Sequence, residues 1–164
     1  MNNKEQVSSL EDLQLLAESG NVEAQYDLSL MYDIGMGVQQ NDEVAAEWFR
    51  KAAEQGHVQA QYNLSNMYIH ASGVPQDDEQ AIAWLRKAAN QGHAYAQYNL
   101  GNMYYQGRYV PQDDELAAHW FLKASEQGHA KAQNSLGIMF SKGEGVPRSS
   151  SQAATWFLKS AQQN

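Results

Sequence analysis

A repeat of 36 residues is the feature that most constrains how this chain can fold. Four consecutive blocks, 20–55, 56–91, 92–127 and 128–163, align without insertion or deletion. The second and third blocks are identical at 21 of their 36 positions. Self-similarity at a period of about 20–50 residues is typical of arrays in which each repeat is one supersecondary unit. The sequence therefore predicts an array of four such units.

Apolar residues recur at helical spacing in two segments of a block. In the second block they fall at i, i+4, i+7 and i+8 in the first segment, and at i, i+3, i+4, i+7 and i+8 in the second. The residues concerned are Ala60, Leu64, Met67 and Tyr68, and then Ala81, Trp84, Leu85, Ala88 and Ala89. Each set occupies one face of a helix. Nothing in the chain alternates with a period of two, so no sheet is expected.

The residues between these helical segments supply turn and cap signals. Gly73 and Pro75 are expected to end the first helix of the second block. Asp77 or Asp78 can accept backbone N–H hydrogen bonds at the start of the second helix. Gly92 follows the second helix and is suited to a left-handed cap. Each block is therefore predicted to be a helix-turn-helix unit.

These signals together predict an all-α fold, a right-handed α-solenoid of four 36-residue helix-turn-helix repeats with an N-terminal capping helix. A pair of helices of about 12–14 residues cannot bury its apolar faces alone, whereas stacked pairs bury them continuously. Residues 9–19 align with the second helix of a block. We therefore expect residues 1–19 to form an N-terminal tail and capping helix, and residues 20–163 to form a single solenoid domain.

Charge and composition disfavour several classes of function. The net charge of −8 argues against binding to nucleic acid. No apolar run reaches the roughly 18–20 residues of a membrane helix, so no membrane insertion is expected. The chain has no Cys, which excludes disulfides and thiolate metal sites. The first twenty residues do not resemble a secretory signal. We expect a cytoplasmic protein, or a periplasmic or secreted one if a signal peptide has been removed.

No arrangement of residues indicates catalysis. His57, His93 and His129 share one column of the repeat, but a repeat step of about 10 Å is too wide for one metal ion, so they are expected to be turn residues. The acidic triplets at 77–79 and 113–115 lack the alternating spacing of a calcium loop and are interpreted as helix caps. The sequence therefore predicts no catalytic residue, no metal and no cofactor, and a protein that is not an enzyme. A hydrolase-like enzyme is retained only as a remote alternative.

A set of short motifs recurs through the blocks. In the third block these are A-x-x-x-L-G-x-x-Y (Ala96 to Tyr104), G-x-x-V-P-Q-D, A-x-x-W-F-x-K-A (Ala117 to Ala124) and E-Q-G. The pattern resembles the Sel-one-like repeat, a branch of the tetratricopeptide-like solenoids that is often found in bacterial proteins, and the resemblance covers residues 20–163. It implies a scaffold or adaptor that binds a peptide or partner protein in a concave groove, and it implies no reaction.

Aromatic and amide side chains between the core positions of the first helices are candidates for the groove. Tyr supplies contact area with few rotatable bonds, and Asn offers both a donor and an acceptor to a peptide backbone. A structural interpretation stays open, in which the tyrosines pack between neighbouring first helices and the asparagines bridge them. The candidate partner-binding residues are Tyr26, Tyr62, Asn63, Asn66, Ile69, Tyr95, Tyr98, Asn99, Asn102 and Tyr105.

The C-terminal end supports an alternative function. The last block ends on its second helix at Gln163, with no further helix to cover Trp156 and Phe157. This block has a net charge of +3, whereas the residues before it sum to −11. A self-assembling structural array, stacked head to tail by weak homo-association through the C-terminal face, would cover these rings. Alternatively, the natural chain continues past this helix, or the end of the helix frays.

Overall fold

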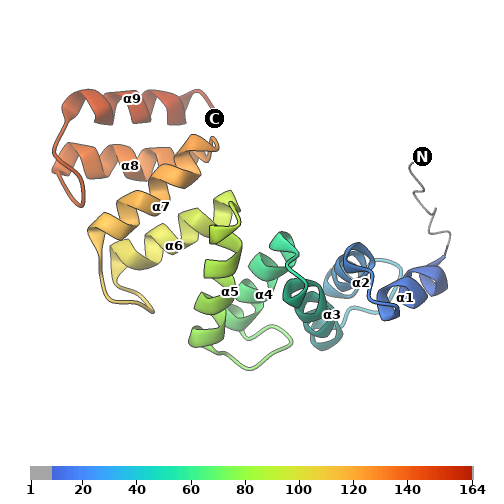
Figure 1. Cartoon of the computed structure of the whole chain (residues 1–164). Helices are drawn as coiled ribbons and strands as arrows, with labels where there is room; N and C mark the ends of the chain where they lie inside the picture. Colours follow the sequence, from blue (N-terminus) through green and yellow to red (C-terminus); the bar gives the residue numbers. More distant parts are fainter. Residues whose placement is uncertain (1–8, 164) are drawn as a thin grey trace. The chain divides into compact units, whose positions relative to one another are not determined.

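The described part of the chain is entirely helical. A computed structural model describes residues 9–163, which form nine α-helices and no strand (Figure 1). The rest of the predicted N-terminal tail, residues 1–8, lies outside the described residues. The helices are α1 (Leu10–Glu18), α2 (Val22–Ile34), α3 (Asp42–Glu54), α4 (Val58–His70), α5 (Asp78–Asn90), α6 (Ala94–Gln106), α7 (Asp114–Glu126), α8 (Ala130–Lys142) and α9 (Ser150–Ala161). The prediction of an all-α protein built from helix-turn-helix repeats, preceded by one extra helix, is confirmed.

The helices belong to two compact units. The first is Met1–Trp84 and the second is Leu85–Asn164, so the boundary falls within α5. In the first unit α2 packs against α1 and α3, and α3 also packs against α4. In the second unit α7 packs against α6 and α8, and α8 also packs against α9. Within each unit, helices therefore contact their neighbours in the sequence, as a repeat architecture requires.

Apolar residues from adjacent helices form the core of each unit. In the first unit, Phe49 of α3 and Leu64 of α4 are at most 1% exposed and belong to one cluster. In the second unit, Phe121 of α7 and Leu136 of α8 occupy the equivalent positions of a second cluster. Small alanines surround these side chains and allow the helices to approach closely. The same columns of the repeat therefore form the core in both units.

Polar side chains begin the second helix of each repeat. Asn41, Asp113 and Ser149 precede α3, α7 and α9, and each accepts a hydrogen bond from the backbone N–H three residues later, at 3.1, 2.9 and 3.3 Å. Asp77 does the same before α5, where its Oδ1 accepts from the backbone N–H of Gln80 at 2.9 Å. The interpretation of the two acidic triplets as helix caps is confirmed, because these bonds satisfy otherwise unpaired N–H groups.

The histidine column begins the first helix of the last three repeats. The Nδ1 atoms of His57, His93 and His129 accept a hydrogen bond from the backbone N–H three residues later, at 3.1, 3.2 and 3.2 Å. Nδ1 can accept only when it carries no proton, so the neutral ring is the one that caps the helix. Burial lowers the pKa of His93 and is the main cause that lowers the pKa of His129. The sequence indicated turn residues here, and the structure gives them a capping role.

A buried glutamine joins each first helix to the second helix that precedes it. Each side chain is only 3–4% exposed. Its Nε2 donates to a backbone carbonyl eight residues earlier, at 3.0–3.1 Å. The pairs are Gln25 with Ala17, Gln61 with Ala53, Gln97 with Ala89 and Gln133 with Ser125. Each carbonyl belongs to the last turn of its helix and also accepts from the backbone N–H of the glycine three residues later, so the glutamine is a further partner at the helix end.

The loop between the helices of one repeat touches the start of the preceding second helix. A Cβ atom added to Gly73 would lie 2.0 Å from the carbonyl oxygen of Asp42. Beside it, the Ser72 hydroxyl donates to Oδ2 of Asp42 at 2.7 Å. In the second unit Gly145 lies equally close to the backbone of Asp114. The contact fixes Ser72 beside α3, where it lines the pocket described next.

Candidate partner-binding surface

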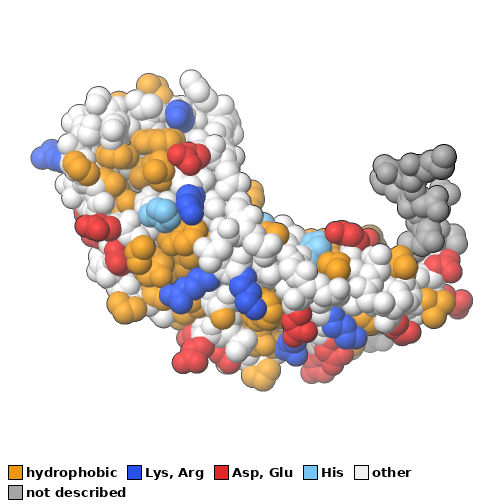
Figure 2. Space-filling model, viewed as in Figure 1, with side chains coloured by type: hydrophobic (Ala, Val, Ile, Leu, Met, Phe, Trp, Pro, Cys, Tyr) orange, Lys and Arg blue, Asp and Glu red, His pale blue; other side chains and the backbone are white. Residues whose placement is uncertain are grey.

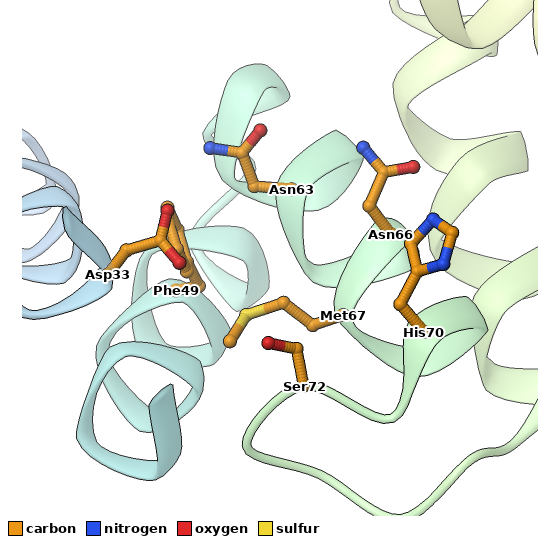
Figure 3. A pocket seen from close by; sticks show the side chains of 7 residues that line it. All are labelled: Asp33, Phe49, Asn63, Asn66, Met67, His70 and Ser72. Carbon is orange, nitrogen blue, oxygen red and sulfur yellow. The ribbon is translucent and has the colours of Figure 1, made fainter. Parts of the chain in front are cut away.

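The first unit contains an open pocket of about 270 Å³ lined by residues of α2, α3, α4 and the loop after α4 (Figure 3). Its base is apolar because it is formed by Phe49 and Met67. These side chains are 1% and 6% exposed. The remaining lining side chains are polar or charged. The lining residues are Asp33, Phe49, Asn63, Asn66, Met67, His70 and Ser72.

Helical spacing brings the polar side chains of α4 to one wall of this pocket. Asn63, Asn66 and His70 stand at i, i+3 and i+7 and therefore share a face of the helix. Asp33, near the end of α2, lies on the other side of Met67 (Figure 3). The pocket thus has a carboxylate on one wall and two amides and an imidazole on the other.

Asn63 is tied to neighbouring side chains. Its Oδ1 accepts a hydrogen bond from Nε2 of Gln59 at 3.2 Å. Its side chain also hydrogen-bonds with the hydroxyl of Tyr26. Burial is the main cause that raises the pKa of Tyr26, and the bond to Asn63 partly opposes it. The structure therefore brings two of the predicted binding residues into contact across adjacent repeats.

Three polar groups of the pocket have no such partner. Within residues 9–163, the side chains of Asp33, Asn66 and His70 make no hydrogen bond or ion pair. Asp33 is half-buried, and burial, followed by repulsion from Asp42, raises the pKa of its carboxyl group. An unpaired, partly desolvated carboxylate is a group that a positively charged ligand would stabilise.

The second unit contains a pocket of about 320 Å³ lined by residues of α6, α8 and α9. Among the residues that the structure describes, Lys131 is the only charged one in this lining, with Asn134 and Ser135 beside it. Ser135 occupies the same column of the repeat as Asn63, so corresponding positions line the pockets of both units. The lining residues are Tyr98, Ala130, Lys131, Asn134, Ser135 and Ser160.

Two of the predicted tyrosines stack on capping histidines of the following repeat. The rings of Tyr26 and His57 lie 4.2 Å apart at 23°, and those of Tyr98 and His129 lie 4.6 Å apart at 25°. Both tyrosines remain half-buried rather than fully buried. These contacts are the ones expected if the tyrosines pack between repeats, and they leave part of each ring on the surface.

The other candidates are distributed over the first helices. Tyr95 is 61% exposed and meets the His129 ring edge-on at 4.8 Å. Tyr105 is held by the loop of the next repeat, because its hydroxyl donates to Oε2 of Glu144 at 2.9 Å. The remaining candidates are half-buried on α4 and α6, and they are Tyr62, Ile69, Asn99 and Asn102.

The sequence reasoning missed three polar residues that line the pocket, Asp33, His70 and Ser72, and the helix faces could have revealed the first two. Asp33 stands in the same column as Ile69 and Tyr105, both of which were selected. It also stands seven residues after Tyr26, and this spacing returns to the same helix face. His70 stands seven residues after Asn63 and was missed for the same reason. Extending the helix faces of Tyr26 and Asn63 by seven residues would have found Asp33 and His70.

Neither metal-binding nor membrane-spanning features were found in the part of the chain that the structure describes. Over residues 9–163, no three His, Asp or Glu side chains converge as metal ligands would. The helices of this range are too short and too polar for any of them to cross a membrane.

Comparisons with solved structures identify similar proteins. The structure of c5321, a protective antigen of uropathogenic Escherichia coli strains with an SLR fold, is 42% identical with a TM-score of 0.90, over 95% of this chain and 33% of that one. A Sel1 repeat protein from Oxalobacter formigenes is 42% identical with a TM-score of 0.89, over 94% of this chain and 44% of that one. The chain therefore spans less than half the length of either protein. Helicobacter pylori cysteine rich protein B, at 24% identity with a TM-score of 0.55 over 71% of this chain and 89% of that one, shares the fold.

Comparison with family models assigns the repeats. The model of the Sel1 repeat matches residues 22–57, 58–93, 94–129 and 130–164. Comparison with curated protein sequences gave no significant match. The four matches cover nearly the whole chain and agree with the helix pairs of the structure and with the resemblance seen in the sequence. The chain belongs to the Sel1 repeat family.

Proposed function

We propose that this protein is an interaction scaffold that binds a peptide or partner protein on the surface formed by its first helices. Sel1 repeat proteins are commonly scaffolds for protein–protein interaction. The observation that carries the proposal is the pocket of the first unit, which combines an apolar base with polar side chains that lack internal partners. Such a mixture is typical of ligand sites, where a few polar groups orient what the apolar surface holds.

Asn66 is the side chain through which the proposal is best tested. Its amide offers a donor and an acceptor, the two groups that a peptide backbone presents. It makes no hydrogen bond within residues 9–163, so its replacement breaks no hydrogen bond of the described fold. Asn63 is less suitable, because its replacement would also release Tyr26.

The experiment has two steps. Affinity capture with the full chain first identifies a partner, and titration of that purified partner then gives its dissociation constant. We expect Asn66→Ala to weaken binding about three- to tenfold, which corresponds to the loss of one hydrogen bond. Glu47→Ala, at an exposed position of α3 outside the pocket, is the matched control and should bind normally. Equal affinity of the Asn66→Ala variant and the unchanged chain would contradict the proposal.

A second candidate function is self-association, which the surface of α9 favours. The columns that hold Ala118, Phe121 and Ser125 are buried in α7. In α9 the same columns hold Ala154, Phe157 and Ala161, and all three are exposed. On the face shown in Figure 2, hydrophobic side chains gather over the second unit and acidic side chains are scattered over the first. An uncovered stripe of this kind marks an interaction surface.

We propose that a second copy of the chain is the occupant of this stripe, because the two ends differ in charge. Residues 1–84 hold fourteen Asp and Glu against three Lys and Arg, whereas residues 85–164 hold eight Lys and Arg against five Asp and Glu. A head-to-tail contact would therefore bring opposite charges together.

Light scattering over a range of protein and salt concentrations tests this second candidate. The mass should rise with protein concentration and fall with added salt. Leu158→Glu, at a side chain of α9 that is 65% exposed, should abolish the rise. Leu116→Glu, at a 40% exposed side chain of α7, should not. A constant monomer mass under all conditions would exclude self-association.

A further inference from the structure

We infer that the pocket between Asp33 and Asn66 binds the cationic side chain of an arginine in the partner. The inference rests on the proposed function and deepens it, because it names the chemistry that the first unit recognises. Four properties of the pocket carry it: the charge of its surroundings, the unpaired carboxylate, the apolar base and the placement of hydrogen-bond acceptors.

The charge of the first unit favours a cation. Residues 1–84 carry an excess of eleven acidic residues, so the electrostatic potential around the pocket attracts positive groups. Among residues 9–163, Asp33 is the only acidic residue in the lining, and no Lys or Arg of this range lines the pocket with it. A guanidinium group would supply the missing opposite charge to a carboxylate that is already partly desolvated.

The size and the base of the pocket suit one long side chain. A volume of about 270 Å³ is below the roughly 300–1,000 Å³ typical of sites for whole small molecules. The exposed part of Met67, with Phe49 beneath it, gives the aliphatic stem of an arginine a small apolar contact at the base of the pocket. Such stems commonly lie along apolar atoms while the charged head reaches polar groups.

The distribution of acceptors favours arginine over the other cations. The guanidinium is a planar fork of five N–H donors, whereas the lysine ammonium is a compact point charge. The carboxylate of Asp33 and the side-chain amide of Asn66 stand on opposite walls, and the planar fork carries donors that point in more than one direction. A divalent metal ion would need several oxygen ligands, and within residues 9–163 no three acidic or histidine side chains converge.

The test uses N-acetyl-arginine amide as the probe and N-acetyl-citrulline amide, which has the same shape without the charge, as its control. Nuclear magnetic resonance of the full chain follows the Met67 methyl group and the Asn66 side-chain amide. We expect the arginine compound to shift both resonances in a saturable way. The citrulline compound should bind at least about tenfold more weakly, because the charge-assisted hydrogen bonds are lost.

Two variants remove one negative charge each from α2. Asp33→Asn, inside the pocket, should weaken arginine binding at least about tenfold, whereas Asp27→Asn, outside it, should leave binding nearly unchanged. If both variants weakened arginine binding equally, the net negative charge of the first unit would explain the binding without the pocket. That result would overturn the inference. So would equal binding of the citrulline compound, or no saturable shift of the Met67 methyl group. The proposed function is judged separately, by the effect of Asn66→Ala on the partner.

Discussion

The contact between Gly73 and the start of α3 makes a strong prediction about stability. Gly73 has a φ of +66°, and an added Cβ would lie 2.0 Å from the carbonyl oxygen of Asp42 and 2.7 Å from the backbone nitrogen of Glu43. Gly56 has a φ of +93° and no atom within 4 Å of its added Cβ. Gly73→Ala and Gly56→Ala therefore both place a side chain on a backbone with positive φ, and only Gly73→Ala adds the overlap.

The expected magnitudes follow from these two contributions. A left-handed backbone costs an ordinary residue about 1–2 kcal/mol relative to Gly, and both variants bear this cost. Overlap in a packed region adds about 1–3 kcal/mol, and only Gly73→Ala bears it. We expect a loss of about 2–5 kcal/mol for Gly73→Ala and about 1–2 kcal/mol for Gly56→Ala. Tyr109 stands in the column of Gly73 with a φ of +67°, so this backbone conformation does not by itself exclude a side chain.

Urea unfolding followed by far-ultraviolet circular dichroism measures the difference between the two variants. The free energy of unfolding should fall further for Gly73→Ala than for Gly56→Ala. Equal losses would show that the loop can move away from α3 without cost, and the role assigned to this contact would then be wrong. The bond from Ser72 to Asp42 provides a second readout, because a displaced loop should also make Ser72→Ala neutral in the Gly73→Ala background.

Two further predictions concern the capping histidines and the core. Burial holds the pKa values of His93 and His129 below the ordinary value of about 6.5. As the pH falls, these histidines therefore take up protons more readily in the unfolded chain than in the folded one. The contribution of the two neutral rings to the free energy of unfolding is present above about pH 6.5 and is lost as the pH falls below it. The variant His93→Asn/His129→Asn keeps a capping side chain that does not titrate, and its unfolding free energy should depend less on pH in urea titrations. Phe121→Ala should cost about 3–5 kcal/mol because the ring is buried. Phe157→Ala, at a ring that is 37% exposed, should cost roughly half as much by thermal unfolding, and equal losses would show that α9 is covered.

The repeat made the fold predictable from the sequence. Four aligned copies reveal the helix faces and the caps at Asp77 and Asp113, because both depend on residues close together in one block. The capping role of His57 was not evident, since histidine is not among the preferred N-cap residues. Its ring also stacks on Tyr26 of the preceding repeat, a contact that only the packed structure shows.

The candidate site was less predictable than the fold. Helix spacing places Asn63 and Asn66 near each other, and the pocket contains both, whereas their role in binding stays a prediction. The bond between Tyr105 and Glu144 joins residues 39 positions apart, and no pattern within a single block indicates it. Whether Asp33 lies free or paired likewise depends on the neighbouring repeat, so side-chain partners had to come from the structure.

The buried glutamines affect how the chain can acquire its structure during synthesis. Each one bonds to a carbonyl only eight residues earlier, so the segment that completes a helix end emerges immediately after that helix. Topologies dominated by such short sequence separations fold rapidly. A nascent chain can therefore complete one hairpin after another as it leaves the ribosome, without waiting for its C-terminal residues.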